Sequence, residues 1–254
     1  MLDLDHYQPK SDALQGRVIL VTGAGSGIGR AAALSFARHG ATVLLLGRTL
    51  AKLEAVYDEI EQAGGAQPAL LPLNLASASG SDYLQMAQMI ETEIGRLDGI
   101  LHNAAILGPL TPLQMYDPDT WDSVMSVNLR APFQLTQALL PLLRQSPDAS
   151  VLFTTSSVGR TARAFWGAYA VSKAGIENLS KIFSDELANV SAIRFNCINP
   201  GATRTNMRAH AYPGENPLNL PTPEQIMLPY LYLMSEASKG VTGQSLDVPR
   251  PTDS

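Results

Sequence analysis

Short apolar runs alternate with longer amphipathic stretches along nearly the whole chain, and this alternation limits the possible folds more than any other feature. The expected strands are residues 18–21, 43–46, 69–71, 99–101, 151–153 and 193–197. Most are continuously apolar, which is typical of parallel strands covered on both faces. The expected helices are residues 28–39, 50–63, 81–94, 119–143, 167–190 and 223–235. The pattern predicts an α/β fold in which a doubly wound parallel sheet carries helices on both faces.

The chain has no internal repeat, no low-complexity tract and no shift in composition that would suggest a linker. We therefore expect residues 1–254 to form one domain. Residues 205–221 are an exception within it, because they are rich in Asn, Pro, His and Gly and follow no regular period. Such a segment is either a surface excursion or a mobile substrate lid. We favour a substrate lid, because the segment follows residues of the candidate site.

Composition excludes several classes of function. The net charge is −5, and no Lys/Arg run is long enough to follow a phosphate backbone, so we expect no nucleic-acid partner. No apolar run approaches the roughly 20 residues of a membrane span, and residues 1–10 lack the apolar core of a secretory signal. The single cysteine, Cys197, and four scattered histidines offer no metal site. These features favour a cytoplasmic protein that binds no metal.

A glycine cluster follows the first expected strand and opens the next helix. Gly23, Gly25, Gly27 and Gly29 stand in the sequence Thr-Gly-Ala-Gly-Ser-Gly-Ile-Gly at residues 22–29. Such a turn lets the backbone approach a pyrophosphate closely, and the following helix offers free N–H groups to the phosphates. A tight structural turn would look similar, but its place between strand and helix favours dinucleotide binding.

The end of the second strand indicates which dinucleotide is bound. An acidic residue there would bind the ribose hydroxyls of NAD, whereas an arginine would accommodate the 2′-phosphate of NADP. This chain has no acid at that place and has Arg48 directly after the strand. Although Arg48 could be a merely solvated loop residue, a guanidinium pairs well with phosphate, so NADP is the favoured cofactor.

Four polar residues form a candidate catalytic set. Tyr169 and Lys173 are four residues apart on one helix face, where the Lys173 ammonium would lower the pKa of the Tyr169 phenol. Ser156 directly follows a buried strand, at the sheet edge where ligands bind. Asn128 interrupts an otherwise apolar helix pattern. Each residue alone could satisfy a cap or the core, but the four together favour catalysis.

These motifs, together with His102-Asn-Ala-Ala at residues 102–105 and Pro-Gly-Ala-Thr-Arg-Thr at residues 200–205, match the short-chain dehydrogenase/reductase superfamily in order and spacing. The match covers residues 17–248, and within the superfamily the chain resembles most the YciK-type bacterial oxidoreductases. The resemblance implies a Rossmann-like sheet of about seven strands. It also implies a homodimer or homotetramer, for which the apolar faces of residues 119–143 and 167–190 are suitable; burial within the monomer is the competing explanation.

The resemblance implies a role for each catalytic residue. Tyr169 would exchange a proton with the substrate oxygen, and Ser156 would orient that oxygen. Lys173 would lower the Tyr169 pKa and bind the nicotinamide ribose, while Asn128 would hold a water between Lys173 and solvent. With the glycine turn and Arg48, the expected cofactor-binding residues are Gly23, Gly25, Ser26, Gly27, Ile28, Gly29, Arg48, Asn74, Leu75, Asn103, Ala104, Ala105, Tyr169, Lys173, Pro200, Gly201, Thr203 and Thr205.

The chain departs from the superfamily pattern at three places. Ala105 stands where a glycine is usual, and Asn74 stands where an aspartate commonly contacts the adenine. Residues 243–251 lack the usual Asp-x-Gly-Gly ending, which places the tetrameric assembly in question. His102, at a strand end, fits a structural residue better than an acid–base.

The sequence therefore predicts an NADP-dependent oxidoreductase that moves a hydride between nicotinamide and a small carbonyl or alcohol substrate. A non-catalytic, NADP(H)-sensing regulatory protein is the alternative, although a sensor would have little need of Tyr169 and Ser156. A methyltransferase is a more distant alternative, because it would not require the Tyr169–Lys173 pair.

Overall fold

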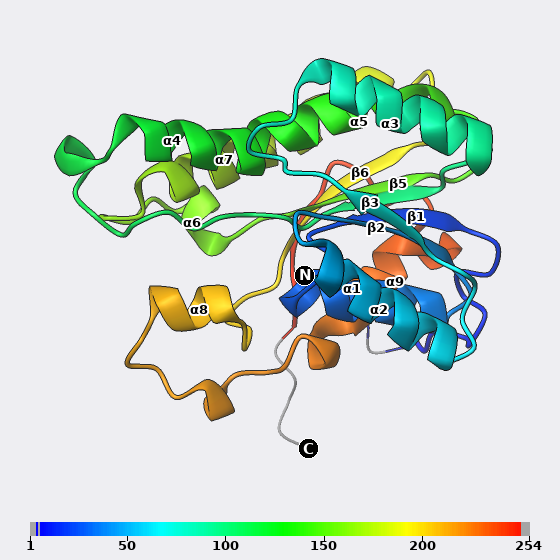
Figure 1. Cartoon of the computed structure of the whole chain (residues 1–254), viewed down its shortest axis with the longest axis horizontal. Helices are drawn as coiled ribbons and strands as arrows, with labels where there is room; N and C mark the ends of the chain where they lie inside the picture. The colour runs from blue at the N-terminus through cyan, green and yellow to red at the C-terminus, as the bar shows by residue number, and fades with distance from the viewer. Residues whose placement is uncertain (1–3, 5, 250–254) are drawn as a thin grey trace.

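The computed structural model describes residue 4 and residues 6–249, so the ends of the expected 1–254 domain lie outside the described residues. Within this part, all strands join one parallel sheet in the order β3-β2-β1-β4-β5-β6-β7, which confirms the predicted fold class (Figure 1). The strands are β1 (Val18–Thr22), β2 (Thr42–Gly47), β3 (Ala69–Pro72), β4 (Gly99–His102), β5 (Ser150–Thr154), β6 (Arg194–Asn199) and β7 (Ser245–Asp247).

Helices cover both faces of the sheet (Figure 1). One face carries α3 (Gly80–Glu93), α4 (Pro118–Met125), α5 (Ala131–Leu143) and α7 (Gly167–Leu187). The opposite face carries α1 (Gly27–Arg38), α2 (Leu50–Gln62) and α9 (Met227–Met234). Two short helices, α6 (Ser157–Arg160) and α8 (Asn206–Ala211), follow β5 and β6 at the carboxyl edge of the sheet.

The continuous apolar strands are explained by two separate cores. Alternate side chains of a strand point to opposite faces, so each face needs its own apolar residues. In β1, Val18 and Leu20 enter the core under α3, α5 and α7, whereas Ile19 and Val21 enter the core under α1, α2 and α9. All four side chains are buried. Both faces of β1 are therefore apolar, which suits a strand at the centre of the sheet, where helices cover both faces.

The connections that follow the two central strands, β1 and β4, run toward opposite edges of the sheet. The chain runs from β1 to β2 and β3 on one side, and then returns to β4 on the other side of β1. The connections after β1 and β4 therefore diverge and leave a crevice at the carboxyl ends of these strands. In open parallel sheets this crevice is the usual ligand site.

Three segments differ from the sequence-based expectation. Strand β7 was not predicted, because Ser245–Asp247 is short and alternates in polarity. The predicted helix over residues 119–143 exists, but a π-helical turn at Ser126–Arg130 interrupts it. Residues 205–221 are not wholly irregular, because α8 forms there, with the Thr205 hydroxyl accepting a hydrogen bond from the Arg208 amide at 3.1 Å.

A buried charge cluster closes the opposite, amino-terminal edge of the sheet. The Asp148 carboxylate pairs with Arg17 and also accepts from Arg194 Nε at 2.9 Å. The Arg194 guanidinium further donates to the carbonyls of Leu233 at 3.0 Å and Ser235 at 3.2 Å. This cluster ties β1, β5 and β6 to the end of α9, far from the ligand crevice.

No helix among the described residues combines the length and apolar character that crossing a bilayer would require. The same part of the chain contains no group of three or more His, Cys, Asp or Glu side chains that could hold a metal ion.

Candidate active site

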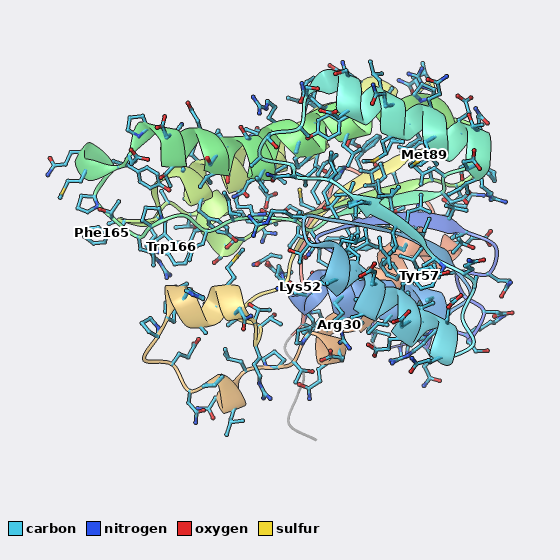
Figure 2. All side chains as sticks on the ribbon, viewed as in Figure 1. Arg30, Lys52, Tyr57, Met89, Phe165 and Trp166 are labelled. Carbon is cyan, nitrogen blue, oxygen red and sulfur yellow. The ribbon has the colours of Figure 1, made fainter. Side chains whose placement is uncertain are left out.

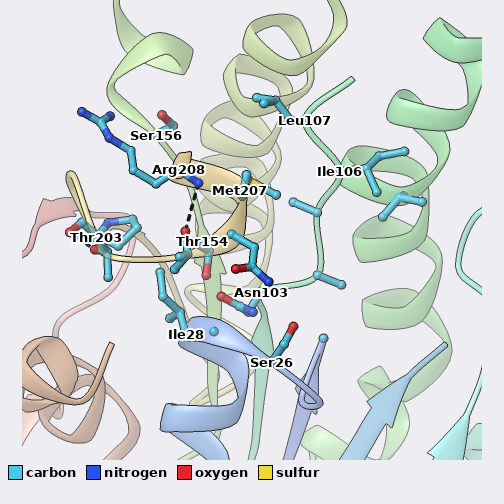
Figure 3. A pocket seen from close by; sticks show the side chains of 18 of the residues that line it. Ser26, Ile28, Asn103, Ile106, Leu107, Thr154, Ser156, Thr203, Met207 and Arg208 are labelled. Atoms are coloured by element: carbon cyan, nitrogen blue, oxygen red, sulfur yellow. Dashed lines mark hydrogen bonds between the residues drawn. The ribbon is translucent and has the colours of Figure 1, made fainter. Parts of the chain in front are cut away.

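A cleft of about 590 Å³ opens at the carboxyl ends of the central strands (Figure 3). It is lined by the glycine turn, by the segments after β2, β3, β4, β5 and β6, and by one face of α7. All predicted site residues except Gly29 and Asn128 line it. The sequence motifs, although spread over more than 180 residues, therefore meet in one place.

The glycine turn is packed too tightly for side chains. Gly23 has a φ of 69°, in the left-handed region that favours glycine. A Cβ on Gly29 would lie 2.3 Å from the Gly23 carbonyl oxygen and 2.7 Å from Asn103 Nδ2. Gly29 thus lies behind the cleft wall and lets α1 begin directly at the turn. Its role is close packing that aims the α1 N-terminus into the cleft.

Thr22 joins the glycine turn to the segment after β4. Its hydroxyl oxygen accepts hydrogen bonds from the backbone amides of Asn103 and Ala104, each at 3.0 Å. The turn and the neighbouring wall are thereby held at a fixed separation. Ala105 follows in the same wall and contributes its methyl group to the cleft.

Basic side chains lie at the end of the cleft beside β2. Arg48 lines it, as predicted, and so does Lys52 in the first turn of α2. Among the described residues that line the cleft there is no Asp or Glu. A lining of this kind fits an anionic ligand and offers no carboxylate to a free ribose, so the residues present fit a phosphorylated dinucleotide.

A further observation supports a ligand here. The Thr155 hydroxyl is buried in the cleft wall and, among the described residues, finds no hydrogen-bond partner. Buried hydroxyls without partners are uncommon, because losing water without a replacement bond is unfavourable. A bound polar group would satisfy this atom.

The proposed catalytic residues meet where β5 ends. Tyr169 and Lys173 lie in the first turns of α7 and are both buried, and Ser156 is the residue before α6. Lys173 Nζ lies 5.6 Å from the centre of the Tyr169 ring and donates to the Thr154 carbonyl at 2.7 Å. The Ser156 and Tyr169 hydroxyls therefore face the same part of the cleft, with the ammonium behind the ring.

The expected lowering of the Tyr169 pKa is not found in this structure. Burial raises the pKa of Tyr169 to about 12, and hydrogen bonding with Ser156 opposes only part of the rise. Burial also lowers the pKa of Lys173 to about 8. The prediction was wrong because burial of the phenol raises its pKa by more than its polar neighbours lower it. The phenol is consequently protonated at neutral pH, as a proton donor must be.

Asn128 lies behind the cleft wall, in the π-helical turn. Its Oδ1 accepts from the Ile106 amide at 2.9 Å, and its Nδ2 donates to the Ile106 carbonyl at 2.9 Å and to Ser172 Oγ at 3.1 Å. Ser172 in turn donates to the Tyr169 carbonyl at 2.8 Å. The side chain thus joins the segment after β4 to α7. Its expected role of holding a water near Lys173 stays a prediction.

The segment after β6 forms the opposite wall of the cleft, and hydrogen bonds to β7 hold it in place. The Gly201 amide donates to Asn199 Oδ1 at 3.1 Å, and Asn199 Nδ2 donates to Asp247 Oδ1 at 2.8 Å. Arg160 Nη1 donates to the same Asp247 oxygen at 2.7 Å, and its Nε pairs with Glu177 at 3.0 Å. Although the chain lacks the superfamily's usual ending, β7 still anchors residues 200–203 through Asp247.

The other predicted residues occupy the places that the sequence suggested. Asn74 and Leu75 line the cleft after β3, and Pro200, Gly201 and Thr203 line it after β6. Thr205 packs against the glycine turn, since a Cβ on Gly27 would lie 3.5 Å from its Cγ2.

His102 is a structural residue, as expected. It is buried, stacks on Phe153 with ring centres 4.8 Å apart, and shares a 2.8 Å hydrogen bond between Nε2 and Thr136 Oγ1. Burial lowers the pKa of His102 to about 3, so the imidazole stays neutral.

Several lining residues were not predicted. Lys52 could have been noticed, because a lysine in the first turn of a helix runs against the helix dipole. Arg208 and Tyr212 lie in residues 205–221, where the sequence gives no orientation for a side chain. Trp166 and Met207 also line the cleft.

Comparisons with known proteins agree with this description. Residues 17–216 match the family model for short chain dehydrogenases. The uncharacterised oxidoreductase YciK of Escherichia coli K12 is 50% identical over 242 residues, which cover 95% of each protein. A solved structure from Pseudomonas syringae is 55% identical with a TM-score of 0.94, covering 98% of this chain and 100% of that one.

Another solved structure, from Escherichia coli CFT073, is complexed with NADPH. It is 50% identical with a TM-score of 0.92, covering 96% of this chain and 100% of that one. The NADP predicted from Arg48 and the missing acid agrees with the cofactor of this neighbour.

Proposed function

Because this chain belongs to the short-chain dehydrogenase family, we propose that it is an NADPH-dependent reductase of carbonyl compounds in which Tyr169 donates the proton. The observation that carries the proposal is the meeting of Tyr169, Ser156 and Lys173 in a cleft lined by basic and by no acidic side chains among the described residues.

The cofactor-binding residues divide along the cleft. The glycine turn and the α1 N-terminus would receive the pyrophosphate, and Arg48 with Lys52 would receive the 2′-phosphate. Residues 200–203 and Lys173 would hold the nicotinamide end. When bound, NADPH supplies the hydride and its electron pair.

The chain's own residues handle the substrate oxygen. Ser156 donates a hydrogen bond that orients the carbonyl oxygen beside Tyr169. Tyr169 then transfers its proton to that oxygen as negative charge develops there. The Lys173 ammonium stabilises the resulting phenolate from behind the ring.

The test is Tyr169→Phe, which removes the hydroxyl and keeps the ring. We expect unchanged NADPH affinity and loss of turnover by about a hundredfold to ten-thousandfold, the range contributed by general acid catalysis. Tyr57→Phe is the matched control, since Tyr57 lies on α2 and its hydroxyl bonds only Glu61 and Gln67. Retained turnover in Tyr169→Phe would refute the assignment.

Arg48→Ala tests the cofactor preference. We expect the NADPH/NADH affinity ratio to fall by about tenfold or more, the range for a lost charged hydrogen bond. Arg38→Ala, at the exposed end of α1, is the control. An unchanged ratio would mean that a group other than Arg48 recognises the 2′-phosphate.

The NADP(H)-sensing alternative is favoured by no observation on the site. It would be supported if the wild-type protein bound NADPH tightly but reduced no member of a broad carbonyl panel.

The same proposal includes a homodimer or homotetramer. A groove between α4, α5 and α7 is lined by Leu129, Phe133, Leu179 and Ile182, and the Phe133 and Ile182 side chains are exposed. Light scattering after size exclusion should give a mass of two or four chains. Ile182→Glu should lower it; a wild-type monomer would refute this part.

A further inference from the structure

The two ends of the cleft differ in whether their basic side chains bond to other residues of the chain. At the cofactor end, Arg48 and Lys52 have no ion-pair or hydrogen-bond partner among the described residues. At the end beside Ser156, the two arginines that line the cleft, Arg204 and Arg208, already bond to other residues of the chain. Arg208 is held by both Glu215 oxygens, at 2.6 Å and 2.7 Å, and Arg204 donates to the backbone carbonyls of Pro217 and Leu220 at 2.8 Å and 3.0 Å.

The engaged arginines give residues 205–221 a defined shape. The Arg204 amide also donates to the Pro221 carbonyl at 2.9 Å, so the segment's two ends are joined. Inside the segment, the Arg208 guanidinium lies 3.7 Å from the centre of the Tyr212 ring. Outside it, Arg163 Nη1 donates to the Tyr212 hydroxyl at 2.7 Å. Tyr212 is therefore fixed from both sides with its ring at the cleft.

The rings of Tyr212, Trp166 and Tyr169 together form an aromatic wall of the cleft. The Tyr212 ring centre lies 5.9 Å from that of Trp166, and the Trp166 ring centre lies 5.9 Å from that of Tyr169. All three side chains line the cleft, as do Met207, Leu107 and Arg208, which Figure 3 shows around the same opening as Ser156. Aromatic and apolar side chains therefore form much of this part of the lining, and the Arg208 guanidinium within it is paired with Glu215.

The backbone on both sides of Trp166 adopts an unusual conformation, with a positive φ at Phe165 and at Gly167. The preceding Phe165 has a φ of 72°, a conformation that is rare for a bulky residue. The following Gly167 packs on Tyr116, because a Cβ there would lie 2.6 Å from the Tyr116 ring. Figure 2 shows Phe165 and Trp166 together at one end of the molecule, where the Phe165 side chain is exposed. Conformations of this kind cluster at functional sites, and this one directly precedes a residue that lines the cleft.

From this arrangement, which rests on the proposed function, we infer that the substrate is an uncharged carbonyl compound with an aromatic ring next to the C=O group. The ring would lie against Trp166 and Tyr212, with the oxygen at Tyr169 and Ser156. An anionic substrate would find the Arg208 guanidinium already paired with Glu215. In the reaction the carbonyl carbon accepts the hydride and electron pair of NADPH, the oxygen accepts the Tyr169 proton, and solvent restores that proton to the phenolate.

Three related α-keto compounds distinguish the effect of an aromatic ring on turnover and binding from the effect of a negative charge. Methyl benzoylformate is aromatic and neutral, benzoylformate is aromatic and anionic, and ethyl pyruvate is neutral without a ring. We expect methyl benzoylformate to have at least a tenfold higher kcat/KM than either of the others. Binding to the NADP⁺ complex is measured separately by quenching of Trp166 fluorescence in a Trp121→Phe background, where Trp166 is the only tryptophan. The same order of dissociation constants is expected.

Glu215→Gln tests the role of the paired charge. Releasing Arg208 from the carboxylate should improve the binding of benzoylformate at least tenfold relative to its methyl ester. Glu93→Gln, on the exposed face of α3, should leave that ratio unchanged. Tyr212→Leu should weaken methyl benzoylformate about tenfold while NADPH titration verifies an intact cofactor site.

The outcomes separate this inference from the proposed function. Preferred binding of the neutral aromatic ester without turnover would support the inference and refute the reductase proposal. Equal or tighter binding of benzoylformate or ethyl pyruvate by the Trp121→Phe protein would overturn the inference, whatever the turnover. An unchanged selectivity ratio in Glu215→Gln would also overturn it.

Discussion

The buried cluster at the amino-terminal edge of the sheet gives a quantitative prediction for Asp148→Asn. The substitution keeps the shape of the side chain but removes the one carboxylate that faces both Arg17 and Arg194. The Asp148 side chain is 11% exposed and that of Arg194 is 4% exposed, so water cannot solvate the guanidinium in place of the lost carboxylate. Removing one partner of a buried pair costs about 3–5 kcal/mol. For a chain of this length, that predicts a fall in Tm of roughly 6–20 °C.

The assay is urea unfolding of both proteins at one fixed protein concentration, so that any assembly affects each equally. Asp185→Asn is the matched control, because Asp185 pairs with Lys181 on the surface of α7, where both side chains are more than half exposed. Its unfolding free energy should change by less than about 0.5 kcal/mol. NADPH affinity of Asp148→Asn should be unchanged, because the cluster lies at the edge opposite the cleft. A loss below about 1 kcal/mol would refute the assignment of Asp148 as the charge that holds this edge together.

Three further predictions concern titration and positioning. Since burial lowers the His102 pKa to about 3, the folded state binds fewer protons than the unfolded state below pH 6.5 and loses stability as pH falls. His102→Gln should reduce the loss of unfolding free energy between pH 7.5 and 4.5 by about 2–3 kcal/mol in urea titrations, and equal losses would contradict this. With the Lys173 pKa near 8, kcat for carbonyl reduction should decline as pH rises through about 8 and the ammonium loses its charge. In Lys173→Arg the decline should move above pH 10, and a decline that stays at pH 8 would identify a different group. Asp247→Ala should raise the KM for NADPH severalfold with a smaller change in kcat, because Asn199 and residues 200–203 lose their anchor; an unchanged KM would show that β7 does not position this wall.

Local patterns made much of the fold and site predictable. The glycine turn and the Tyr169–Lys173 spacing are contiguous in sequence and have a direct local meaning, and Ser156 was found because it follows a buried strand. Six of the strands have apolar runs that stand out in the sequence. In contrast, β7 is held by pairing with β6 and by Arg160, contacts that its own three residues do not indicate.

The remaining features depend on tertiary packing. The pKa values of Tyr169 and Lys173 are set mainly by burial under neighbouring elements, so their spacing alone gave the wrong direction for Tyr169. Arg208 appears in the sequence as one more cation in an irregular segment. Its neutralisation by Glu215 and its contact with Tyr212 become visible only when that segment is folded.

The joined ends of residues 205–221 have a consequence for how this fold diversifies. Arg204 and Pro221 are linked by a backbone hydrogen bond, so the chain enters and leaves the segment at nearly the same point. Closing a loop between ends that already meet adds little entropy for each added residue. Insertions, deletions or a transplanted sequence within residues 206–220 can therefore be accommodated while the sheet stays as it is and Thr205 still packs against the glycine turn. On our proposal that this segment contacts the substrate, such exchanges would change specificity without changing the residues that hold the cofactor.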